Sequence, residues 1–291
     1  MNKYTHNASD PYASVSTPVL KIPYFICVIL GVLIMFLNYA PLIILNFVPF
    51  LKPIAKSHVF VEVLIGMVTF ALVLVTCLFL TKIASKHSLN ASLEEIGWTF
   101  SKYSIRNFCL GWLLVSLAMI LAQVFAKTFH FDHRLMEAAD TSNPTIVAIT
   151  LISAFGKGVL MQGMPEEIIW RGWMMNCLKN RPIKSLILSS LFFALLHFLS
   201  SGGQENFIER VIYVFDAGAF AFLAGALALR LKSLWPAFGV HGGLHLTNAL
   251  LSMTPFRIDG PIIWITQSIL WIIIGLTLLK NFKGKTVNYI Y

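Results

Sequence analysis

Long apolar runs follow one another along almost the whole chain, and they restrict the possible folds more than any other feature of the sequence. A helix crosses a hydrocarbon core of about 30 Å with about 20 apolar residues. Runs of this kind predict membrane-spanning helices at residues 22–48, 59–82, 106–126, 145–180, 183–200, 210–230, 234–252 and 261–281. A transmembrane β-barrel would instead need alternating segments of about ten residues, and the sequence does not show them. We therefore expect an all-α, polytopic transmembrane helical bundle of about eight helices.

The composition excludes an ordinary soluble domain, because only 12% of the 291 residues are charged and 57% are hydrophobic. Soluble domains carry about 25% charged residues. The net charge of +9 would suit a nucleic-acid partner, but Lys and Arg lie at the ends of the apolar runs and form no basic stripe. We expect a lipid bilayer and no nucleic acid. The four cysteines have no paired spacing, so neither a disulfide framework nor a zinc knuckle is predicted.

The basic residues predict the orientation of the chain, because cytoplasmic loops of membrane proteins are enriched in Lys and Arg. With the N-terminus inside, fourteen lie on the inner side and six on the outer side. The inner set is Lys3, Lys21, Lys82, Lys86, Lys102, Arg106, Lys179, Arg181, Lys184, Arg230, Lys232, Lys280, Lys283 and Lys285, and the outer set is Lys52, Lys56, Lys127, Arg134, Arg210 and Arg257. We expect both termini in the cytoplasm, and a bacterial plasma membrane as the location. The first apolar run is long and has no small-residue cleavage site after it, which favours a retained span over a signal peptide.

Two segments depart from simple spans. The fourth run is too long for one straight crossing, and we expect it to bend or break at Gly156, Gly158, Gly163 or Pro165. Residues 84–104 carry charged side chains and a tryptophan, and they predict a short helix at the membrane interface.

Ionisable residues at membrane depth gather in the second half of the chain. Each costs about 2.5 to 3.5 kcal/mol on insertion scales, so such residues usually pair with one another or serve a function. They are Glu166, Glu167, Arg171, His197, Asp216, His241 and His245.

The first group of these ionisable residues, Glu166, Glu167 and Arg171, follows Pro165 directly. Glu167 and Arg171 are four residues apart with the acid first, which favours an ion pair on a helix. Glu166 is turned about 100° away and stays available as a base. The alternative is an ordinary helix start, with a proline and two acids stabilised by the helix dipole.

His197 closes the second group. A single histidine on an apolar face is more often structural than catalytic. However, Glu166 and His197 lie at nearly equal distances from the turn expected at Asn180–Pro182. At a rise of about 1.5 Å per residue both sit roughly 22 Å from that turn, so they are predicted at the same depth.

The third group is His241, His245 and Asn248, which share one helical stripe. Gly239 and Gly243 beside them would let a neighbouring helix approach closely. Polar contacts between helices are the alternative explanation. Asp216 is expected to be structural. A loop group of His130, Asp132, His133 and Glu137 has the residue types of a metal site, but such loops are usually only solvated.

Together, Glu166-Glu167-x-x-x-Arg171, Phe193-x-x-x-His197 and the His241 group resemble the CPBP (or ABI) family of intramembrane proteases. The family includes CAAX prenyl endopeptidases, bacteriocin-processing proteins and lysostaphin-resistance proteins. The resemblance places a catalytic core at residues 143–252. It leaves N-terminal helices of unassigned role at 1–140 and a C-terminal helix with a basic tail at 253–291.

The resemblance implies the roles of these residues. Glu166 and His197 would activate a water, with Glu167 and Arg171 beside them, and His241 and the residue four positions later would stabilise the oxyanion. The family usually has Asn at that later position, whereas this chain has His245, and Asn248 is a second candidate. His197, His241, His245 and Glu166 could also bind Zn²⁺. A metal-free glutamate mechanism needs the same residues, so both stay open.

The expected function is therefore an endopeptidase that cleaves a membrane-associated protein or peptide, either a CAAX-type protein, prenylated or not, or a leader or pheromone peptide. A non-catalytic membrane scaffold or immunity protein of the same fold is the alternative. A proton-coupled transporter would be supported by inverted repeats, and the sequence shows none.

Overall fold

The described part of the chain is helical throughout. The computed structural model describes residues 22–48, 59–86, 88–131, 134–178 and 180–282. Its elements are α1 (Tyr24–Asn38), α2 (Ala40–Phe47), α4 (Val59–Ser85), α5 (Leu89–Glu95), α6 (Ser104–Thr128), α7 (Pro144–Ser153), η1 (Ala154–Gly163), α8 (Met164–Glu167), η2 (Ile168–Met174), α9 (Pro182–Leu196), η3 (His197–Leu199), α10 (Phe207–Leu231), α11 (Trp235–Ser252) and α12 (Pro261–Leu279). These residues form no β-strand, only one isolated bridge between Leu135 and Ile258. The all-α prediction is confirmed.

Each predicted span is a helix, and seven of the described helices are long and apolar enough to cross a membrane. The predicted span without that composition is α11, because it carries two histidines and an asparagine. It is nevertheless well packed, with most of its first half buried. Large apolar side chains on the outside, such as Phe60 and Leu113, are exposed, as expected for a bundle whose solvent is lipid.

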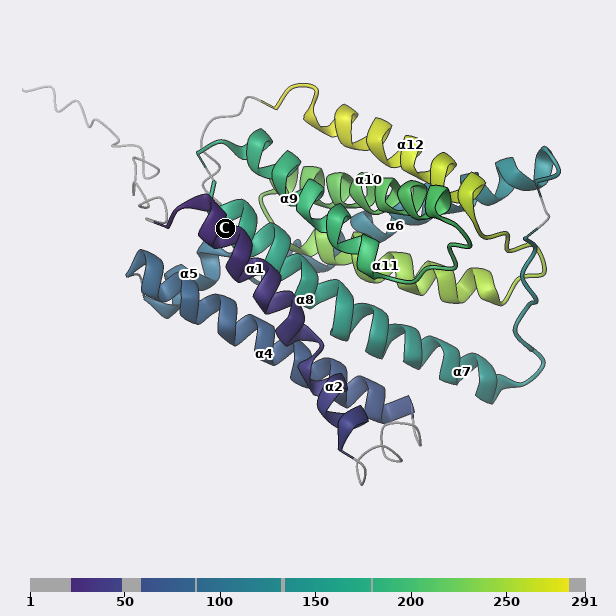
Figure 1. Cartoon of the computed structure of the whole chain (residues 1–291), viewed down its shortest axis with the longest axis horizontal. Coiled ribbons are helices and arrows are strands. Elements are labelled where there is room, and N and C mark those ends of the chain that lie inside the picture. Colours follow the sequence, from purple (N-terminus) through teal and green to yellow (C-terminus); the bar gives the residue numbers. More distant parts are fainter. Residues whose placement is uncertain (1–21, 49–58, 87, 132–133, 179, 283–291) are drawn as a thin grey trace, which may run out of the picture.

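The predicted break in the fourth span is wrong. Pro144–Met174 form one continuous helical run of 31 residues (Figure 1). Two stretches of it, η1 and η2, have the wider π-helical turn, and they flank the single α-helical turn that contains Pro165. Proline removes a backbone donor and crowds the preceding turn. A change to π-helix accommodates such a defect without ending the helix.

Helix α10 occupies the centre of the bundle, with α9, α11 and α12 around it (Figure 1). Helix α6 packs closely against α11 and also contacts α12. At Gly239 any side chain would collide with the Phe108 carbonyl of α6. The predicted close approach at this glycine is therefore confirmed.

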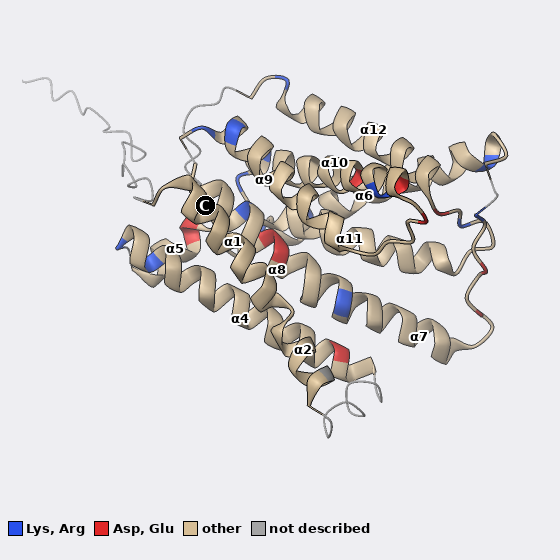
Figure 2. Ribbon diagram, in the orientation of Figure 1, with Lys and Arg blue, Asp and Glu red and all other residues tan. Residues whose placement is uncertain are grey.

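Apart from Lys157 and Arg171, which lie within η1 and η2, the described Lys and Arg residues are unevenly divided between the helix ends (Figure 2). Nine flank the ends that the sequence analysis places inside, and four flank the opposite ends. The nine are Lys82, Lys86, Lys102, Arg106, Arg181, Lys184, Arg230, Lys232 and Lys280, and the four are Lys127, Arg134, Arg210 and Arg257. The start of α1 and the end of α12 lie at the same end of the bundle, because the successive long helices alternate in direction (Figure 1). The cytoplasmic orientation of both termini stays a prediction.

Candidate functional site

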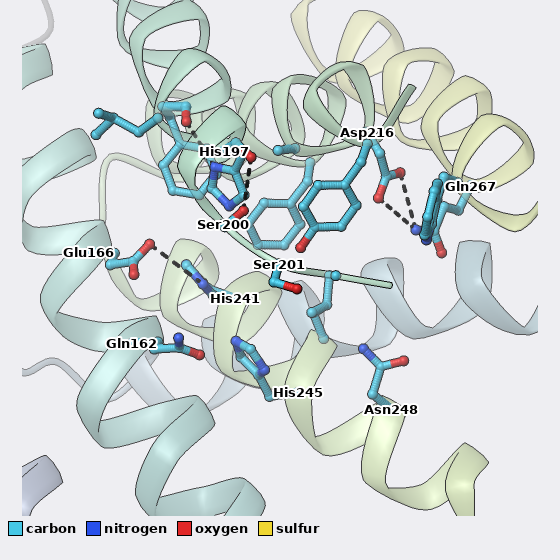
Figure 3. A pocket seen from close by; sticks show the side chains of 18 of the residues that line it. Gln162, Glu166, His197, Ser200, Ser201, Asp216, His241, His245, Asn248 and Gln267 are labelled. Atoms are coloured by element: carbon cyan, nitrogen blue, oxygen red, sulfur yellow. Dashed lines mark hydrogen bonds and ion pairs between the residues drawn. The ribbon is translucent and has the colours of Figure 1, made fainter. Parts of the chain in front are cut away.

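A cavity of about 720 Å³ lies in the interior of the bundle. Four of the six predicted site residues line it, and they come from three separate stretches of helix (Figure 3). They are Glu166, His197, His241 and His245. The other two, Glu167 and Arg171, lie behind the cavity wall and are fully buried.

Arg171 and Glu167 form the ion pair that their spacing predicts, with 2.9 Å between Nη1 and Oε1. Arg171 also donates to the Ala221 carbonyl of α10 at 2.8 Å. The same Glu167 oxygen lies 2.9 Å from Nδ1 of His241. A carboxylate accepts from both partners, so Nδ1 of His241 is the donor, and in a neutral ring Nε2 is then the acceptor. Arg171 therefore fixes Glu167, and Glu167 fixes the orientation of His241.

Glu166 faces this free ring nitrogen. Its Oε2 lies 4.0 Å from Nε2 of His241, and its side chain is almost fully buried. The other oxygen, Oε1, accepts a hydrogen bond of 3.2 Å from the Tyr39 hydroxyl. Because 4.0 Å is shorter than two hydrogen bonds of about 2.8 Å end to end, one water can contact both Glu166 and His241.

His197 begins the short 3-10 turn that follows α9. Its Nδ1 lies 2.9 Å from the Phe193 carbonyl, which can only accept, so this nitrogen carries the proton and Nε2 is free. The Phe193 ring lies near both imidazoles, with its centroid 4.5 Å from that of His197 and 6.0 Å from that of His241. As the hairpin predicted, Glu166 and His197 reach the same cavity.

His245 stacks on His241, with 5.5 Å between ring centroids and an angle of 18° between the rings. Its place depends on Gly158 of η1, where any side chain would collide with the β-carbon of His245. Gly158, predicted as a possible bend, is thus a point of close packing. Asn248 also lines the cavity, farther from Glu166 than His245 in Figure 3.

Three further polar residues of the cavity escaped the sequence analysis or received no role there. Tyr39 lies between α1 and α2, and no local pattern connects it with Glu166, 127 residues away. Gln162 precedes Glu166 by four residues and points into the cavity beside it (Figure 3); the helical spacing alone could have revealed it. Asp216, expected to be structural, is bound to α12 and also lines the cavity.

The predicted zinc ligands do not converge in this arrangement. Among the residues that the structure describes, no group of three or more His, Cys, Asp or Glu side chains could hold a metal ion. The ring of His241 stacks on that of His245, with 5.5 Å between the ring centroids. The zinc prediction rests on the sequence alone. In the loop group, Asp132 and His133 lie outside the described residues.

Comparison with protein families gives a match over residues 144–247 to the type II CAAX prenyl endopeptidase Rce1-like family. The match contains all six predicted site residues, and it confirms the resemblance that their motifs predicted. In general terms it supports an intramembrane endopeptidase with a membrane-associated protein substrate. No curated protein and no solved structure matches the chain.

Proposed function

We propose that this protein is an intramembrane endopeptidase that hydrolyses a peptide bond in a membrane-associated protein or peptide. One observation carries the proposal. The buried carboxyl group of Glu166 faces Nε2 of His241 across 4.0 Å, in a cavity that His197 also lines. A carboxylate and an imidazole at one water position are the groups that general-base hydrolysis needs.

Glu166 is the proposed base. It takes a proton from the water held between itself and His241, and the resulting hydroxide attacks the carbonyl carbon of the scissile bond. Protonated Glu166 then returns that proton to the leaving amine, which breaks the C–N bond and restores the carboxylate. The products are one new carboxyl and one new amino group. Because Tyr39 donates to Oε1 of Glu166, Oε2 is directed at the water.

The negative charge on the former carbonyl oxygen needs hydrogen-bond donors. His245 is the proposed donor, because no hydrogen bond to another described residue fixes either of its ring nitrogens, and it stacks beside His241. The water has two hydrogens: Glu166 takes one, and Nε2 of His197 or of His241 is proposed to accept the other. Glu167 and Arg171 position His241 and do not touch the substrate.

The substrate class is proposed as either a CAAX-type protein, prenylated or not, or a leader or pheromone peptide. The family match over residues 144–247 supports the first. The test uses the full chain in liposomes, with quenched fluorescent peptides of two kinds: farnesylated CAAX-type peptides and unprenylated leader-type peptides. Mass spectrometry of the products identifies the cleaved bond.

Glu166→Gln is expected to lower the rate of cleavage by about 10²- to 10⁴-fold, since it removes the base and keeps the shape. Glu62→Gln is the matched control, because Glu62 also lies in a predicted span but pairs with Lys157 outside the cavity. Cleavage that survives unchanged in Glu166→Gln would refute Glu166 as the base, and the absence of cleavage by the unchanged chain would favour the scaffold or immunity protein. The metal-free mechanism is tested in the same assay: we expect 1,10-phenanthroline to leave the rate unchanged.

A further inference from the structure

The cavity has a second polar wall, away from Glu166, where α10 packs against α12. Asp216 of α10 is almost fully buried there, and its carboxylate oxygens accept three hydrogen bonds from α12. Gln267 donates to both oxygens, at 3.1 and 2.9 Å, and the Ser268 hydroxyl donates to one of them at 2.7 Å. Figure 3 shows Asp216 and Gln267 together at one side of the cavity.

None of these partners is positively charged. Among the described residues no Lys, Arg or His forms an ion pair with Asp216. A buried carboxylate is usually balanced by a cation, and one at membrane depth marks a functional site by default. Asp259, which lines the same cavity, adds a second acid. Arg257 also lines the cavity, without a hydrogen bond or ion pair from its side chain to Asp216.

Two aromatic rings complete this wall. Tyr213 lies three residues before Asp216 on α10, and Trp264 lies three residues before Gln267 on α12, so each ring is on the same helix face as its polar neighbour. The rings meet edge to face, with centroids 5.3 Å apart, and both line the cavity. Aromatic faces beside a carboxylate attract alkylammonium and guanidinium groups.

We propose that Asp216, Tyr213 and Trp264 form a cation subsite, which binds a lysine or arginine side chain of the substrate while Glu166 attacks the peptide bond. This specificity rests on the proposed function, because both walls belong to one cavity. A purely structural Asp216, which only joins α10 to α12, is the competing explanation.

The first test measures cleavage by the full chain in liposomes, using a peptide series in which lysine or its neutral analogue norleucine occupies each position in turn. We expect one position at which kcat/KM favours lysine by at least ten-fold. In Asp216→Asn this ratio should fall to near one, and in Trp264→Leu it should fall several-fold. Arg257→Gln, which removes a charge of the same cavity, is the control and should not lower the ratio. If Asp216→Asn slows both peptides equally, Asp216 is structural and the subsite is refuted.

The second test separates this proposal from the proposed function. Binding of hexylammonium and of hexanol to Glu166→Gln is measured by the shift in thermal unfolding, with and without the added Asp216→Asn change. We expect a shift with hexylammonium that exceeds the shift with hexanol and disappears in the double variant. This result supports the subsite even if no peptide is cleaved. Equal shifts with the two compounds would overturn it, even if cleavage is observed.

Discussion

At the scale of single residues, the site depends on a hydroxyl from outside the segment that matches the family. Tyr39 donates to Glu166, whereas the match begins at residue 144. Hydrogen bonds to charged groups contribute about 1.5 to 3 kcal/mol, and 1.36 kcal/mol corresponds to a factor of ten in rate. Tyr39→Phe should therefore lower kcat by about ten- to a hundred-fold and leave KM nearly unchanged, because the hydroxyl contacts the base and not the substrate.

Steady-state kinetics of Tyr39→Phe measure this effect. Tyr103→Phe is the control, since that tyrosine is exposed and lies beside Arg106, outside the cavity. A kcat equal to that of the unchanged chain would show that the Tyr39 hydroxyl does not orient Glu166.

The second prediction at this scale concerns the buried ion pair between Arg171 and Glu167. Arg171 is fully buried and compensates the equally buried Glu167. Removing one partner of such a pair leaves an unbalanced charge and costs about 3 to 5 kcal/mol of folding free energy. Arg171→Met should lower the unfolding temperature in detergent and reduce cleavage, because His241 loses its fixed orientation. Arg171→Met combined with Glu167→Gln should recover part of the stability. An unchanged unfolding temperature in the single variant would contradict a role for this pair in holding the fold.

Whether a contact in the site could be predicted depends on how far apart its two residues lie in the sequence. The Glu167–Arg171 pair was predictable, because its geometry is that of one helical turn. The bond between Glu167 and His241 joins residues 74 apart, and the bond between Tyr39 and Glu166 joins residues 127 apart. Such contacts depend on how three or four helices pack, which periodicity does not determine. The family resemblance implied an oxyanion role for His241, and no local pattern predicted its hydrogen bond to Glu167.

At the scale of elements, the contact between α6 and α11 holds His241 and His245 in place. Its closest point is Gly239, which faces the Phe108 carbonyl. Gly239→Ala should separate the two helices, lower the unfolding temperature and weaken cleavage, because an added methyl has no space against a backbone group that cannot turn away. Gly218→Ala is the control. Its methyl would meet only that of Ala194, at 3.3 Å.

Thermal unfolding and cleavage of the two variants provide the test. If Gly239→Ala is as stable and as active as Gly218→Ala, then close packing of these helices does not position the histidines.

The same scale shows what apolar periodicity can and cannot predict. All eight predicted spans are helices, because run length and turn residues are local features. The π-helical stretches η1 and η2 were missed, since a pattern analysed with the α-helical period of 3.6 cannot distinguish an inserted residue from a break. Pro165, interpreted as a possible break, lies inside a continuous helix.

At the scale of the whole molecule, the cavity and the charge asymmetry together predict the side from which a substrate arrives. The cavity extends to residues 199–202 and 257–259, in the loops beside the C-terminal end of α9 and the N-terminal end of α12. Four described basic residues flank this end of the bundle and nine flank the other. The positive-inside rule then places the loops of the cavity on the outer, non-cytoplasmic side.

Thiol labelling of intact cells tests this orientation. In a Cys109→Ser background the described native cysteines are buried, so a cysteine introduced on the surface supplies the signal. Ser201→Cys, exposed beside the cavity, should react with a membrane-impermeant maleimide. Lys184→Cys, exposed at the opposite end, should react only after the cells are permeabilised. Labelling of Ser201→Cys from outside would favour a leader or pheromone peptide as the substrate. The reverse pattern would contradict the orientation and place the loops of the cavity in the cytoplasm, where prenylated CAAX proteins occur.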